Sequence, residues 1–98
     1  MSEHAESHDR DNHLIHHRNR LAGLWAAELL GLFGHAATDY VHAVMHPGHS
    51  PDTQHGDDEL AVEAKLFKDL SGRVTLSEIR SRMARYMDEA RSFFQGKR

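Results

Sequence analysis

Hydrophobic positions recur at intervals of three and four residues in several segments of the chain, which predicts helices. The first predicted helix covers residues 13–33, and Gly34 is expected to end it as a C-cap glycine. Gly23 and Gly31 are expected to allow close helix packing. The second predicted helix covers residues 35–46 and stops before Pro47. The apolar positions of these two helices are Leu14, Leu21, Trp25, Leu29 and Leu32 in the first, and Ala37, Tyr40, Val41, Val44 and Met45 in the second.

A loop rich in proline and glycine, residues 47–56, precedes a third predicted helix that starts at Asp57 or Asp58 and is closed by Gly72. Its inward positions are predicted to be Leu60, Ala64, Phe67 and Leu70. Thr75 and Glu78 form a capping box at the start of a fourth helix. That helix is predicted to bury a single stripe of residues, Ile79, Met83, Tyr86, Met87, Ala90, Phe93 and Phe94.

No stretch alternates between apolar and polar residues over a useful length, so strands are not predicted. The sequence therefore predicts an all-α fold, a four-helix bundle formed by residues 13–98. Residues 1–12 are polar and aperiodic, and we predict that they form a disordered or fraying N-terminal tail.

Composition narrows the class of protein. The 98 residues include no cysteine, which excludes disulfides, thiolate metal sites and a thiol nucleophile. No apolar run reaches the length of about 20 residues that a membrane span needs. The N-terminus does not resemble a signal peptide, so we expect a soluble, cytoplasmic protein. The net charge is −3, although residues 73–98 are basic, and this balance disfavours nucleic-acid binding.

Glu28 is the only charged residue between Leu21 and Phe33. At about 100° per residue it falls within the apolar arc of the first helix, and a buried carboxylate is costly without a partner. We therefore predict an ion pair between Glu28 and either Arg18 or an arginine of the last helix. Trp25 lies in the same arc and is predicted to be largely buried against the fourth helix.

The stretch from Arg18 to Gly31 reads R-N-R-L-A-G-L-W-A-A-E-L-L-G. It resembles the core signature of the zeta subunit family of alphaproteobacterial F-type ATP synthases, including its divergent paralogues. Weaker matches follow within residues 56–60, 69–72 and 77–83. The resemblance implies a four-helix, all-α regulatory protein that binds the catalytic subunits of the ATP synthase head.

In that family, some members inhibit ATP hydrolysis by inserting an N-terminal helical segment into the head. The resemblance thus implies that partner-binding residues include Leu14, Ile15, Arg18 and Asn19 and that Trp25 and Glu28 are structural signature residues. The N-terminus departs from the family because it carries histidines in place of lysines and alanines and has no aromatic residue before residue 13. A non-inhibitory paralogue, a small helical binding protein, is therefore the alternative.

Ten histidines are the second unusual feature of the chain. His35, Asp39, His42 and His46 follow one another in steps of four, three and four, which places them along one line of the second helix. Such spacing suits a divalent metal such as zinc, but it also suits a solvated helix surface or a pH-responsive one. No cofactor is required by the sequence. No catalytic triad order, phosphate-binding glycine loop or His-Glu-x-x-His motif occurs, so enzymatic activity is not expected.

Overall fold

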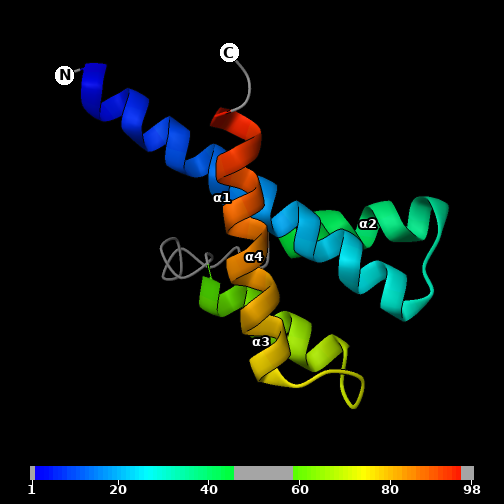
Figure 1. Ribbon diagram of the computed structural model, residues 1–98. Helices are drawn as coiled ribbons and strands as arrows, with labels where there is room; N and C mark the ends of the chain where they lie inside the picture. The colour runs from blue at the N-terminus through cyan, green and yellow to red at the C-terminus, as the bar shows by residue number, and fades with distance from the viewer. Residues whose placement is uncertain (1, 46–58, 96–98) are drawn as a thin grey trace.

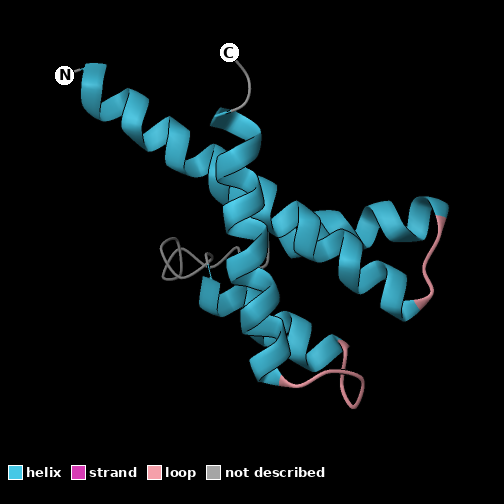
Figure 2. Cartoon of the chain, in the orientation of Figure 1, coloured by secondary structure: helices cyan, strands magenta, loops and turns pink. Residues whose placement is uncertain are grey.

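The computed structural model describes residues 2–45 and 59–95. Over these residues the chain is helical, without strands (Figures 1 and 2). The helices are α1 (Ser2–Leu30), α2 (Gly34–Met45), α3 (Glu59–Asp69) and α4 (Leu76–Gln95). The prediction of an all-α, four-helix fold is confirmed.

The helices are arranged as two hairpins. Helix α1 packs against both α2 and α4, and α3 packs against α4 and, over a smaller area, against α2. Figure 1 shows α4 crossing α1, with the α1–α2 connection and the α3–α4 connection on the same side of the molecule. The first turns of α1 extend away from the other helices. The N-terminal end of the chain therefore projects from the body of the domain.

Helix α1 is longer at its start than the hydrophobic pattern predicts. It begins at Ser2, so helical backbone continues through the segment predicted to fray. Apolar periodicity is lost before residue 13, but polar residues can continue a helix that is already nucleated. The division into a tail of residues 1–12 and a domain of residues 13–98 stays a prediction.

Helix α1 ends at Leu30, three residues before the predicted end, and Gly31 is its C-cap glycine. Gly31 has a φ of 75°, its N–H donates to the carbonyl of Glu28 at 3.1 Å, and the N–H of Leu32 donates to the carbonyl of Ala27 at 2.9 Å. These two bonds form a Schellman motif. The assignment of the cap to Gly34 was therefore wrong, because Gly34 instead starts α2.

The two glycines of α1 have different roles. A Cβ atom on Gly23 would lie 3.1 Å from Cα of Val41 and 3.3 Å from Cβ of Val44, so α1 and α2 approach closely at this point. The prediction of close packing is confirmed for Gly23. It is wrong for Gly31, where a Cβ atom would meet nothing within 4 Å.

The core takes buried side chains from all four helices. Its buried members are Ala22, Ala26, Val44, Val62, Leu66, Leu70, Ile79, Met83 and Tyr86. Helix α4 buries Ile79, Met83, Tyr86 and Ala90, which confirms the central part of its predicted stripe. At its C-terminal end the stripe becomes accessible, since Met87 and Phe94 are half-buried and Phe93 is 47% exposed.

Trp25 contacts α4 as predicted but is only half-buried. It packs at the edge of the core, and the guanidinium of Arg82 lies over its ring, 5.0 Å from the centroid. This cation–π contact replaces part of the apolar contact that the sequence pattern suggests. The prediction that Trp25 packs against the fourth helix is confirmed, and part of its ring remains accessible at the edge of the core.

The inward side of α3 agrees with the prediction only at Leu70, which is fully buried together with Val62 and Leu66. The other predicted positions are exposed: Ala64, Leu60 at 70% and Phe67 at 50%. Both sets recur at helical spacing, so the pattern alone does not distinguish them. The start of α4 is as predicted, because the N–H of Glu78 donates to Oγ1 of Thr75 at 3.1 Å.

Candidate partner-binding surface

Two imidazole rings of α1 stack on two phenylalanine rings near the end of α4. The rings of His17 and Phe93 are nearly parallel, with centroids 4.7 Å apart and an interplanar angle of 13°. The His13 and Phe94 rings are 6.0 Å apart at 17°. Phe93 and Phe94 meet edge to face at 5.1 Å. These contacts fix the orientation of α1 relative to the last turns of α4, just where α1 begins to project from the body.

Two hollows flank Phe94 at this crossing. One, with a volume of about 290 Å³, is bordered by α1, α2 and α4, and the other, of about 360 Å³, by α1 and α4. The first is lined by His13, His16, His17, Arg20, Met45 and Phe94. The second is lined by Leu14, Arg91, Phe94 and Gln95. We refer to the residues that line these two hollows, together with Phe93, as the α1–α4 junction.

The residues that the resemblance marks as partner-binding are divided between surface and interior. Leu14 and Ile15 are half-buried, and Leu14 belongs to the α1–α4 junction. Arg18 and Asn19 are buried, and Nε of Arg18 donates to Oδ1 of Asn19 at 3.0 Å. In this conformation Leu14 and Ile15 are therefore the accessible part of the set.

Glu28 is exposed, so its predicted place on the inward side of α1 was wrong. Among the side chains of residues 13–45 and 59–95, it forms no ion pair with Arg18 or with any arginine of α4. Helix α1 turns a side of small residues inward, namely Ala22, Gly23, Ala26 and Ala27. Small residues let α2 and α4 approach α1 closely. In this packing the larger leucines of α1 lie nearer the surface.

The buried carboxylate of the described residues is Glu63 on α3, which is 5% exposed. Its Oε1 atom accepts a hydrogen bond from Nε of Arg80 on α4 at 3.2 Å. A buried carboxylate next to an arginine is a stabilising arrangement only while both partners are present. The apolar spacing of α3 gives no sign of this burial, because Glu63 is a charged residue outside the predicted inward positions of that helix.

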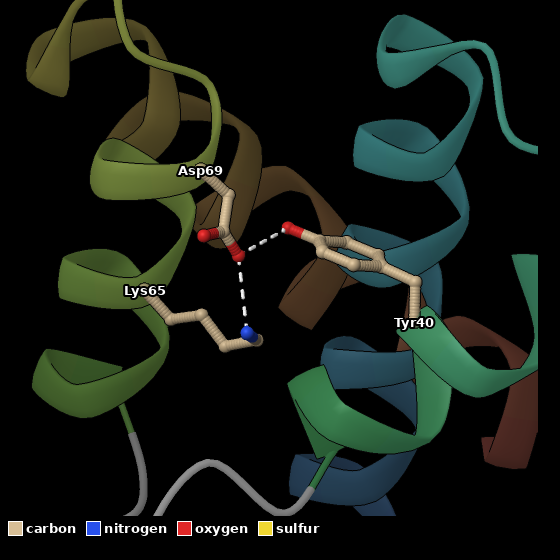
Figure 3. Close-up of polar contacts among 3 residues, drawn as sticks. All are labelled: Tyr40, Lys65 and Asp69. Atoms are coloured by element: carbon tan, nitrogen blue, oxygen red, sulfur yellow. Dashed lines mark hydrogen bonds and ion pairs between the residues drawn. The ribbon is translucent and has the colours of Figure 1, made fainter. Parts of the chain in front are cut away.

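A hydrogen bond also joins the two hairpins, between α2 and α3 (Figure 3). The hydroxyl of Tyr40 donates to Oδ2 of Asp69 at 2.9 Å, and Nζ of Lys65 lies 3.0 Å from the same oxygen. Lys65 also lies over the Tyr40 ring, 5.3 Å from its centroid. Burial, and next the hydrogen bond and charge of Asp69, raise the pKa of the Tyr40 hydroxyl well above its usual value near 10.

Replacing Tyr40 with phenylalanine should lower the free energy of unfolding by about 1 kcal/mol at neutral pH, because the bond to Asp69 is lost. The folded state raises the pKa of Tyr40, so this hydroxyl stabilises the fold fully below pH 10 and progressively less above it. The gap between wild type and Tyr40→Phe should therefore narrow as the pH rises above 10. Urea denaturation from pH 7 to 11 measures it, and a gap that stays constant would contradict this account.

Three of the four side chains predicted to bind a metal on α2 lie within the part of the chain that the structure describes. His35, Asp39 and His42 are exposed side chains of α2, and His46 lies outside the described residues. Within residues 13–45 and 59–95, whose side chains the structure describes, no three His, Asp or Glu side chains come together in a way that could hold a metal ion. Metal binding that involves His46 stays a prediction.

Comparison with known proteins gives one match. The family model described as ATPase inhibitor subunit zeta matches residues 3–92, which include α2, α3 and most of α1 and α4. No curated protein and no solved structure matches the chain. Of the helices described, none is both long enough and apolar enough to cross a membrane.

Proposed function

This chain belongs to the ATPase inhibitor subunit zeta family, and we propose that it regulates an F-type ATP synthase by binding the catalytic subunits of the head and inhibiting ATP hydrolysis. The observation that carries the proposal is the extent of the family match, which includes nearly all of α1 and not only the segment around Trp25. A regulatory role of this kind needs no catalytic group of its own. It requires only that a segment of the chain occupy a space that the working enzyme must open and close.

The projecting part of α1 is the segment best suited to such a steric block. Figure 1 shows that it extends away from the other helices, while the ring stacks of His13 and His17 hold the next turns against α4. A segment that enters its site as a helix continuous with a folded domain loses less conformational freedom than an unattached one. The folded body then supports the inserted segment and adds contacts of its own.

The test uses the isolated catalytic head of the ATP synthase from the same cell. Full-length protein should lower the rate of ATP hydrolysis. A variant lacking residues 2–12 should need a concentration at least about tenfold higher for the same inhibition, which corresponds to about 1.4 kcal/mol in the apparent free energy of binding. Glu28→Gln is the control, because Glu28 is exposed and lies outside the projecting segment. Equal inhibition by the truncated variant would exclude the N-terminal segment as the blocking element.

A non-inhibitory role with a pH-responsive or metal-responsive histidine surface is the second candidate. It is favoured by the position of His13, His16 and His17, which line one hollow, and of His42, which lines an adjoining one. Imidazoles change charge near neutral pH, so such a surface could alter its affinity for a partner there. Binding of the full-length protein to the head without any change in ATP hydrolysis, between pH 6 and 8, would favour this candidate over inhibition.

A further inference from the structure

The α1–α4 junction combines accessible apolar side chains with basic ones. Phe93 is 47% exposed, and Leu14 and Phe94 are half-buried at the edges of the two hollows. Arg20 on α1 borders one hollow, and Arg91 on α4 borders the other. An apolar centre with charged side chains at its margin is the usual composition of a protein-binding site.

The permanently charged side chains at this junction are basic. Among the side chains that the structure describes, those lining the two hollows include two arginines and no aspartate or glutamate. Arg91 pairs with Asp88, whose Oδ1 lies 3.3 Å from Nη1 of Arg91 in a solvent-exposed ion pair. Exposed pairs of this kind are weak, so Arg91 can exchange Asp88 for another carboxylate at little cost. The chain as a whole carries a net charge of −3, which makes this basic junction stand out.

The aromatic part of the junction is held in place before any partner arrives. Stacking on His17 orients the ring of Phe93, and the edge-to-face contact between Phe93 and Phe94 orients the second ring. Side chains that are already ordered lose little entropy when a partner covers them. The volumes of the hollows on the two sides of Phe94, about 290 and 360 Å³, leave room for apolar side chains of a partner.

We propose that the α1–α4 junction binds an acidic amphipathic helix of the ATP synthase head, with apolar side chains of that helix in the two hollows and its carboxylates against Arg20 and Arg91. This inference rests on the proposed function and adds a second contact to it. The projecting segment of α1 blocks the head. The junction, whose residues come from α1, α4 and, with Met45, α2, holds the folded domain on the head. Charge complementarity at the margin selects an acidic partner over a basic one.

The test measures the affinity of the full-length protein for the isolated catalytic head, with charge-reversal variants. Arg20→Glu and Arg91→Glu should each weaken binding by about tenfold or more, and wild-type affinity should fall as salt is raised from about 50 to about 300 mM. Arg85→Glu is the matched control, because Arg85 is an exposed arginine of α4 that pairs with Glu89 and lies outside the junction. It should change the affinity by less than about twofold.

The outcomes separate the two proposals. Equal affinities for wild type and all three variants would overturn the junction as a docking site and leave the proposed function standing. Absence of any binding by the wild type would overturn both. Thermal melts confirm that each variant is folded, and Arg20→Gln and Arg91→Gln, which remove charge without reversing it, replace any variant that is not. If light scattering shows that the junction instead joins two copies of this chain, the proposed partner is wrong.

Discussion

Replacing Gly23 with leucine should lower the free energy of unfolding by about 3 kcal/mol, through overpacking between α1 and α2. A side chain at this position would meet Cα of Val41 at 3.1 Å, which is backbone and cannot rotate away. The helices would have to separate, and fully buried Val44 would lose contacts with α1. Leucine favours a helix by up to about 1 kcal/mol over glycine, but this gain is smaller than the packing loss.

Chemical denaturation monitored by circular dichroism measures this effect. Ala36→Leu on α2 is the control. It also introduces a leucine into a helix, but Ala36 is exposed, so the added side chain extends into solvent. Gly23→Ala should fall between wild type and Gly23→Leu. If Gly23→Leu proved as stable as the wild type, the close approach of α1 and α2 would be refuted.

Replacing Leu66 with alanine should lower the free energy of unfolding by about 2–5 kcal/mol, because Leu66 is fully buried and its loss leaves a cavity. Leu60→Ala is the matched control, with the same chemical change on the same helix at a residue that is 70% exposed. It should change stability by less than about 0.5 kcal/mol. The two denaturation curves thus determine which side of α3 faces the core. A larger loss for Leu60→Ala would restore the side that the apolar spacing predicts.

The number and type of the helices could be read from the sequence because each depends on local features. The stripe of Ile79, Met83, Tyr86 and Ala90 is the one apolar side of α4, so its burial follows from periodicity alone. The cap at Thr75 likewise depends only on residues within one turn. The family was also recognisable, because the stretch around Trp25 is contiguous and specific.

The candidate site could be predicted only in part. Leu14 was expected to contact a partner and does lie at the accessible α1–α4 junction. Phe93 and Phe94 were expected in the core, but α4 reaches the projecting part of α1 there, and His13 and His17 cover the two rings incompletely. No spacing rule along one helix could have paired these imidazoles with rings from the other end of the chain.

The helical class, the buried stripe of α4 and the family follow from local sequence patterns alone. Which sides of α1 and α3 face inward depends instead on how the helices pack against one another. Both helices carry apolar residues on more than one side, so a period of 3.6 residues is compatible with several rotations about the axis. The rotation of each helix is set by contacts between helices: Gly23 of α1 lies against Val41 of α2, and Glu63 of α3 pairs with Arg80 of α4. These contacts depend on how closely two helices approach, and for that reason Glu28 is left in solvent while Glu63 is buried.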